Sequence, residues 1–133
     1  MNPVLIDTSL WILVLREGAP EAPKKEVQRI VSDGSAATCG MILVELLGGT
    51  RTPKEFGELL EELQALHYLP VTDHVWLSAS RLSFELRRKG LIVPTTDVLI
   101  ASVALNSNCL LLHSDHHFEL ISKHTDLKSH IVK

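Results

Sequence analysis

Two apolar runs that each lead into an aspartate decide the fold of this chain: Val4-Leu5-Ile6-Asp7 and Leu110-Leu111-Leu112-His113-Ser114-Asp115. Short, continuous apolar runs are typical of strands that are buried on both faces of a parallel sheet. In such sheets, ligands bind beyond the carboxyl ends of the strands. Asp7 and Asp115 both occupy that kind of position, so the sequence predicts that they lie at the same edge of one sheet.

The rest of the chain alternates between extended and helical patterns. We expect strands at 3–6, 36–39, 67–70, 109–113 and 127–132. We expect helices at 8–15, from Pro20 to about Gly34, at 41–47, from Pro53 to about Leu66, from Thr72 or Asp73 to Gly90, at 97–105 and at 115–122. Strands that alternate with helices favour a parallel sheet covered on both faces. The predicted fold class is therefore α/β, a three-layer α/β/α sandwich with a central parallel sheet.

The helical segments carry apolar residues whose spacing predicts buried faces. The segment 41–47 is apolar nearly all round and is expected to be buried, while Trp11, Trp76 and Phe84 are expected in the core or in an interface. Thr or Ser residues are expected to cap the helices that begin near Thr8 and Thr95. The predicted inner stripes of three other helices are Val27, Ile30 and Val31; Phe56, Leu59, Leu60, Leu63 and Leu66; and Val75, Trp76, Ala79, Leu82 and Leu86.

Composition bounds the class of protein. A chain of 133 residues that is 45% hydrophobic and 22% charged predicts one globular domain spanning 1–133. The net charge of −3 argues against a protein that coats nucleic acid by bulk charge. The N-terminus does not resemble a signal peptide, and no apolar run approaches the ~20 residues that span a bilayer. The two cysteines, Cys39 and Cys109, are expected to be buried and reduced. We expect a cytoplasmic protein without a membrane segment.

Four carboxylates sit at chain positions that one small α/β fold could gather at a single point: Asp7, Glu45, Asp97 and Asp115. Clustered carboxylates repel and raise each other's pKa, and a bound divalent cation relieves that repulsion. Hard cations such as Mg²⁺ take oxygen ligands, and such ions can activate water for an in-line displacement at phosphorus. The pattern favours a Mg²⁺- or Mn²⁺-dependent phosphodiesterase.

Each acid also has a structural alternative. Asp7, Asp97 and Asp115 stand where helix N-termini favour a carboxylate through capping and the helix dipole. Glu45 is the single charge in an apolar segment, and its alternative is an ion pair with Arg51. The residues alone leave both interpretations open for every member of the set.

Further polar residues surround the four acids in sequence. The hydroxyls of Thr8, Ser9, Thr96 and Ser114 are placed to hold water or phosphate. His113, His116 and His117 carry no accompanying cysteine pair, so a dedicated zinc site is not expected.

Arg16, Arg81 and Arg88 are candidates for contact with RNA phosphates. For Arg81 and Arg88, a solvated helix face is the structural alternative.

Taken in order, the acidic segments resemble the four motifs of PIN domains. The segments are Ile6–Trp11, Glu45–Gly48, Pro94–Asp97 and Leu111–Phe118. The compact length resembles the VapC-type toxins of toxin–antitoxin pairs. The resemblance implies a metal-dependent endoribonuclease using Mg²⁺ or Mn²⁺, with Asp7, Glu45, Asp97 and Asp115 as metal ligands and catalytic residues. It implies that Ser9 supports the site, with Thr96 and His117 beside it. It also implies an RNA substrate, a homodimer, and an antitoxin that covers the active-site groove.

The last motif departs from the pattern of the family. That motif often reads Thr-x-Asp-x-Asp-Phe, and here His113 and His117 replace the threonine and the second aspartate. His117 could bind metal through water, contact phosphate or do neither. The alternative function is a non-catalytic PIN-like scaffold that binds RNA or a protein partner, and metal binding would discriminate the two.

Overall fold

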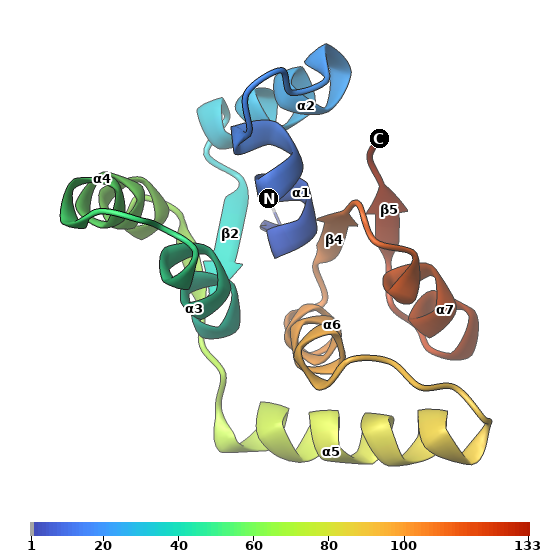
Figure 1. Cartoon of the computed structure of the whole chain (residues 1–133). Helices are drawn as coiled ribbons and strands as arrows, with labels where there is room; N and C mark the ends of the chain where they lie inside the picture. The colour runs from blue at the N-terminus through green and yellow to red at the C-terminus, as the bar shows by residue number, and fades with distance from the viewer. Residues whose placement is uncertain (1) are drawn as a thin grey trace.

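A computed structural model describes residues 2–133 and shows one five-stranded, fully parallel sheet with strand order β3-β2-β1-β4-β5 (Figure 1). The strands are β1 (Val4–Ile6), β2 (Ala36–Cys39), β3 (His67–Leu69), β4 (Leu110–His113) and β5 (Ser129–Ile131). The predicted segments match these elements: β2 has the expected bounds, β1, β3 and β4 are each one residue shorter than expected, and β5 is three residues shorter. The predicted parallel sheet is confirmed.

Helices enclose the sheet from both sides. They are α1 (Thr8–Leu15), α2 (Glu21–Ser32), α3 (Gly40–Gly48), α4 (Pro53–Gln64), α5 (Asp73–Arg88), α6 (Thr95–Ser107) and α7 (His116–His124). In Figure 1, α1 and α2 lie on one side of the strands and the packed pair α5 and α6 on the other. The three-layer α/β/α arrangement is as the sequence predicted.

The strand order reverses between β1 and β4. From β1 the chain adds β2 and then β3 on one side, and it returns to place β4 and β5 on the other. The crevice at such a reversal, outside the carboxyl ends of the strands, is where open α/β sheets bind their ligands. The fold therefore directs attention to the residues that follow Ile6 and His113.

The core is formed by the central strands and the helices that cover them. Leu5, Ile6, Leu111 and Ile100 have no exposed surface, and α6 buries nearly every residue from Val98 to Ala104. A helix that is apolar all round belongs in the interior of a sandwich, and here it packs against both α5 and β4.

Four residues predicted to face inward are exposed: Val31, Val44, Phe56 and Trp76. Val44 shows that α3 is only half-buried, with Ile42 and Leu46 on its inner side. Phe84, expected in the core or an interface, is also 62% exposed, whereas Trp11 is buried as expected. These side chains lie beside the buried face of their helices. Apolar periodicity predicts which side of a helix is buried, but not how much of its surface the neighbouring elements cover.

Two predicted helix caps differ from the structure. Asp7, not Thr8 or Ser9, caps α1, and Pro94 precedes α6 without any side-chain cap, so Thr95 and Thr96 lie inside its first turn. Pro94 has a φ of −54°, which its ring fixes, and it has no backbone N–H that would need a hydrogen-bond partner. Of Thr72 and Asp73, between which the sequence left the start of α5 open, Thr72 is the cap, since its hydroxyl accepts the Val75 N–H.

No helix within residues 2–133 is both long enough and apolar enough to cross a bilayer. Cys39 and Cys109 are both free and buried, as expected.

Candidate active site

Backbone geometry brings the predicted acids to the carboxyl edge of the sheet. Asp7 follows β1 directly, and its N–H donates to the Leu112 carbonyl of β4 at 2.9 Å. Asp115 follows β4 by two residues. Asp97 lies in the first turn of α6, which runs back toward the start of β4, so its N-terminus is at this same edge. Glu45 lies in α3, which begins immediately after β2. Four separate elements therefore contribute one acid each.

Asp7 is the most deeply buried of these acids, with 2% of its surface exposed. Its Oδ2 accepts the Ser9 N–H at 2.8 Å and so caps α1. Its Oδ1 is buried and has no hydrogen-bond partner among residues 2–133. Burial raises the pKa of Asp7, and the charge of Glu45 raises it further, although hydrogen bonds from Ser9 oppose the shift. A buried oxygen without a partner is costly unless a ligand completes it.

Glu45 is held by a neighbouring helix. Its Oε1 accepts a hydrogen bond from the Thr8 hydroxyl at 2.8 Å, which ties α3 to the start of α1. No ion pair joins Glu45 to Arg51 within residues 2–133, so that alternative is not what the structure forms. The acid faces Asp7 rather than a basic residue.

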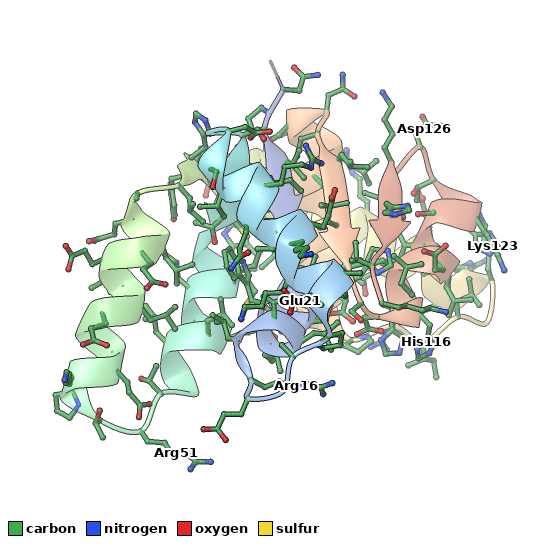
Figure 2. All side chains as sticks on the ribbon, turned by 90° about the horizontal axis from the view of Figure 1, so that it is seen from above. Arg16, Glu21, Arg51, His116, Lys123 and Asp126 are labelled. Carbon is green, nitrogen blue, oxygen red and sulfur yellow. The ribbon has the colours of Figure 1, made fainter. Side chains whose placement is uncertain are left out.

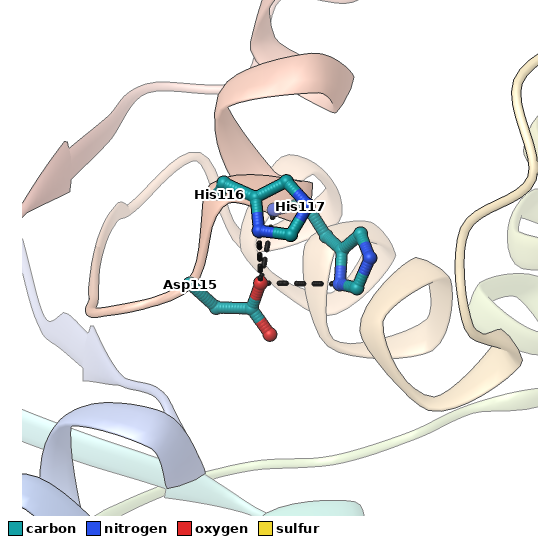
Figure 3. A group of neighbouring side chains, drawn as sticks. All are labelled: Asp115, His116 and His117. Carbon is teal, nitrogen blue, oxygen red and sulfur yellow. Dashed lines mark hydrogen bonds and ion pairs between the residues drawn. The ribbon is translucent and has the colours of Figure 1, made fainter.

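His117 lies between the other two acids. Its Nδ1 is 3.1 Å from Asp97 Oδ2 and 3.1 Å from Asp115 Oδ1. Its backbone N–H donates to Asp115 Oδ1 at 3.0 Å, which makes Asp115 the cap of α7. Figure 3 shows both histidine rings turned toward the Asp115 carboxylate, with His116 Nδ1 at the longer distance of 3.6 Å. The imidazole thus connects two acids that are 18 residues apart in sequence.

The charges of the acids act on one another. The pKa of Asp97 is raised to about 6, first by burial and then by the negative charges of Asp115 and Asp7, while His117 partly offsets the rise. Since Asp7 in turn responds to Glu45, all four acids belong to one electrostatic group. Carboxylates arranged in this way resist ionisation unless positive charge is supplied.

His113 holds the backbone of Asp115 in place through a hydrogen bond. The ring is fully buried, and its Nδ1 accepts the Asp115 N–H at 3.2 Å. It packs against Phe118 with ring centroids 5.0 Å apart. Its Nε2 lies 3.4 Å from Glu119 Oε1, without the geometry of a hydrogen bond. Burial lowers the pKa of His113, so the ring is neutral near pH 7. Glu119 was not singled out in the sequence, where nothing but its place directly after the last motif could have indicated it.

Two hydroxyl groups fix the frame around the acids. The Ser9 Oγ accepts the Ser114 N–H at 2.9 Å, which links α1 to the segment that carries Asp115. Thr8 is buried and holds Glu45, a more specific position than the sequence indicated. Thr96 lies beside Asp97 in the first turn of α6.

The three candidate arginines do not share one location. Figure 2 shows Arg16, at the end of α1, and His116 along the same edge of the molecule, with Asp126 toward the opposite edge. Arg81 lines a cleft with Asn106 and Asp126, and Asn106 lies at the far end of α6 from Asp97. Arg88 is exposed, and its guanidinium lies 5.5 Å from the centre of the Phe84 ring. Of the three, Arg16 is on the acidic side of the molecule.

The donor set fits a divalent cation. Carboxylate oxygens suit Mg²⁺ and Mn²⁺, and the unpartnered Oδ1 of Asp7 is an oxygen with no other role within the described residues. One carboxylate oxygen of Asp115 and one nitrogen each of His116 and His117 lie within 4.8 Å of one another, a spacing that could hold an ion. This group therefore contains two imidazoles as well as an acid.

Comparison with known proteins identifies the family. The model of the PIN domain matches residues 4–123, which spans all four acids and the whole sheet except β5. The chain belongs to the PIN-domain family. The resemblance seen in its four motifs is confirmed.

The relatives of this PIN domain carry related names. It is 31% identical over 130 residues to the VapC ribonuclease Mb1587 of Mycobacterium bovis, covering 95% of this chain and 96% of that one. Ribonuclease VapC11 of Mycobacterium tuberculosis matches to the same extent.

Solved structures share the fold of this PIN domain. VapBC2 of Rickettsia felis, bound to a DNA fragment from its promoter, superposes with a TM-score of 0.80 at 21% identity and covers 98% of both chains. DNA-bound VapBC of Salmonella typhimurium superposes with a TM-score of 0.81 at 20% identity, again over 98% of both chains.

Proposed function

We propose that this protein is a divalent-metal-dependent endoribonuclease of the VapC type, which acts as the toxin of a toxin–antitoxin pair. One observation carries the proposal: four carboxylates from four elements lie at the switch point of the sheet, and one of them, Asp7, is buried with an oxygen that has no hydrogen-bond partner among residues 2–133. The relatives named as VapC ribonucleases, at 31% identity over nearly the full length, support the choice of RNA as substrate.

Asp7, Glu45, Asp97 and Asp115 would hold Mg²⁺ or Mn²⁺. When bound, such an ion activates a water molecule and stabilises negative charge on the phosphate oxygens. The chain's own residues prepare the site before RNA arrives: Thr8 orients Glu45 at 2.8 Å, and the Ser9 N–H orients Asp7. Fixed ligands of this kind reduce the reorganisation that the reaction requires.

RNA reaches the acids from the side that carries Arg16. The acidic edge repels phosphate until a cation is present, and an arginine at the rim offsets part of that repulsion. Arg16 ends α1, whose first residues hold two of the acids. We assign Arg16 to phosphate contact, and we place Arg81 outside the RNA path because it lies beside Asn106 and Asp126.

An antitoxin is the proposed protein partner. A groove of about 490 Å³ runs between α1, α2 and α4, with an apolar floor formed by Trp11, Val14, Val27, Leu63 and Leu66. Lys24 and Glu62 stand on its rim. Such a groove suits an amphipathic segment. Since α1 forms both a wall of the groove and part of the acid site, a partner seated there would continue over the acids. The VapBC complexes among the structural neighbours support this choice.

A second copy of the chain is the proposed partner of α5. Trp76, Leu77 and Phe84 are each at least half exposed and lie on this long helix at the margin of the molecule (Figure 1). Large apolar side chains on one element are typical of a surface that associates. A homodimer through α5 would cover them and leave the acidic edge open.

An RNA substrate and two buried, unpaired cysteines also agree with the proposed cytoplasmic location.

RNA cleavage tests the proposal directly. Purified protein is incubated with total cellular RNA and Mg²⁺ or Mn²⁺, beside an Asp97→Asn variant purified in the same way and a sample with EDTA. We expect discrete fragments from the wild type alone, because a contaminating nuclease would survive in the variant.

The opposite result has a defined meaning. If neither cation supports cleavage and calorimetry detects no Mn²⁺ binding, the enzymatic proposal is wrong, and the non-catalytic scaffold replaces it. Fragments that persist in Asp97→Asn at the wild-type level would remove the acids from the mechanism.

A further inference from the structure

His117 stands where the family pattern places a second aspartate, and its position in the structure is specific. Its Nδ1 is equally distant, at 3.1 Å, from an oxygen of Asp97 and an oxygen of Asp115. The two acids come from different elements, the first turn of α6 and the cap of α7. The ring is therefore held by contacts with both acids rather than lying free in solvent.

The distances match the surroundings of an ion. Neighbouring ligands of an octahedral cation with bonds of about 2.1 Å are about 3 Å apart. The ring is held in this place because the His117 N–H donates to Asp115 Oδ1 at 3.0 Å. Asp7, whose charge acts on Asp97, adds a buried oxygen without a partner. The site therefore offers one nitrogen among several oxygens.

Nitrogen and oxygen ligands prefer different metals. Imidazole suits transition metals, whereas Mg²⁺ takes oxygen ligands and keeps much of its water. We propose that His117 Nδ1 binds the cation directly and makes this site select Mn²⁺ over Mg²⁺ more strongly than an aspartate at the same position would. The inference rests on the proposed function only in assuming that a divalent cation binds at these acids.

His116 provides an internal contrast. It is the neighbouring residue and its ring lies 4.3 Å from that of His117, but its side chain is 76% exposed and its Nδ1 is 3.6 Å from Asp115 alone. It contacts one acid from outside, whereas His117 joins two. We therefore assign direct ligation to His117. The matched control is His124, an exposed histidine in the last turn of the same helix.

The test measures cation affinity, independently of catalysis. Isothermal titration of the purified chain with Mn²⁺ and with Mg²⁺ gives the ratio of the two dissociation constants for the wild type, His117→Asp and His124→Asp. Both variants add the same charge. We expect the preference for Mn²⁺ to fall about 10-fold or more in His117→Asp, the size of effect that changes around metal ligands produce, and to stay within about 2-fold of the wild type in His124→Asp.

A spectroscopic readout detects the bond itself. Electron spin-echo envelope modulation of the Mn²⁺-loaded protein, prepared with ¹⁵N-labelled histidine, reports nitrogen bound directly to manganese. We expect the ¹⁵N coupling in the wild type and in His124→Asp, and its loss in His117→Asp. Absence of the coupling in Mn²⁺-loaded wild type, or an unchanged affinity ratio in His117→Asp, would overturn the inference.

The two proposals fail separately. RNA cleavage together with Mn²⁺ binding that shows no nitrogen coupling would leave the nuclease intact and overturn the role of His117. Nitrogen coupling without cleavage of any cellular RNA would support the ligand assignment while contradicting the proposed function.

Discussion

The two ends of the parallel sheet follow opposite rules. At the amino end, local contacts satisfy each turn: Asp33 accepts the Ser35 N–H at 3.0 Å, and Gly34 and Asn108 take the positive φ angles that these turns need. At the carboxyl end, four acids repel one another, and Asp7 and His113 each keep a buried polar atom that no residue of the described part of the chain hydrogen-bonds. One end is arranged for stability, and the other holds charges that folding alone does not favour.

This difference separates the residues that stabilise the fold from those of the candidate active site. Local sequence and global fold agree over most of a natural protein, and conflicts between them concentrate at functional sites. The acidic edge is such a conflict, and the proposed cation would relieve the repulsion there. Substitutions at the carboxyl end should therefore change RNA cleavage and cation binding, whereas substitutions at the amino end should change stability.

Removal of one acid gives the largest expected effect. Asp97→Asn should lower RNA cleavage by more than about 100-fold, because the loss of a ligand exceeds the 10- to 100-fold cost of disturbing the surroundings of one. The matched control is Asp126→Asn, which removes the same charge on the far side of the molecule (Figure 2). Single-turnover cleavage rates measure both. Equal losses in the two variants would mean that overall charge, not the acid site, governs activity.

Cation binding should stabilise the folded chain through the acidic end alone. At a Mn²⁺ concentration 100 times the dissociation constant, the free energy of unfolding rises by about 2.7 kcal/mol. Urea denaturation with and without Mn²⁺ checks this, and Asp97→Asn should show little gain. A comparable gain in that variant would place the cation elsewhere.

Without cations, stability should fall as pH rises from about 4 to about 6. The pKa of Asp97 is about 6 in the folded protein against an ordinary 3.8. Between these values the unfolded chain has released the proton that the folded chain still holds, so a rising pH favours unfolding. The loss is roughly 2 kcal/mol. Denaturation in EDTA at several pH values, with Asp97→Asn subtracted, measures it. A difference between the two proteins that does not change with pH would contradict the raised pKa.

A change at the amino end should cost stability and leave the metal site alone. Gly34→Ala places a Cβ at φ +80°, which costs about 1–2 kcal/mol for an L-residue. Urea denaturation should show this loss, while calorimetry should give the wild-type affinity for Mn²⁺. A changed affinity would show that the two ends are coupled.

The smallest effect distinguishes two surface arginines. The logarithm of the RNA-binding constant falls linearly with the logarithm of the salt concentration. Arg16→Ala should make this slope shallower by about one, which is the signature of a lost phosphate contact. Arg81→Ala should not, because Arg81 lies beside Asn106 near the carboxyl end of α6, away from Asp97 in the first turn of that helix. Each arginine variant is combined with Asp97→Asn, so that the RNA is not cut. Filter binding of RNA at several salt concentrations then measures both slopes. The reverse ranking would move the RNA path to the other face of the molecule.

Much of the fold is readable from the sequence because local signals and tertiary structure agree there. The helix Thr8–Leu15 and the strand Ala36–Cys39 are as predicted, since apolar runs bounded by polar or glycine residues leave few alternatives. Val44 and Trp76 were placed wrongly because their exposure depends on which elements pack beside them. The sequence holds no direct record of that packing.

The site shows the same limit more sharply. The positions of Asp7 and Asp115 follow from strand ends, and their convergence needs only the parallel sheet. The contact of His117 with both Asp97 and Asp115 depends on the rotation of α7 and on one side-chain torsion. The partnership of His113 with Glu119 depends on the same helix. Neither follows from residue spacing.

The most direct test of the acidic edge as a cation site is anomalous diffraction from crystals of this chain soaked in Mn²⁺. The account predicts a manganese peak in contact with carboxylate oxygens of Asp7, Asp97 and Asp115 and with His117 Nδ1. Saturating Mn²⁺ with no peak among these residues, or with a peak only at unrelated surface acids, would contradict it.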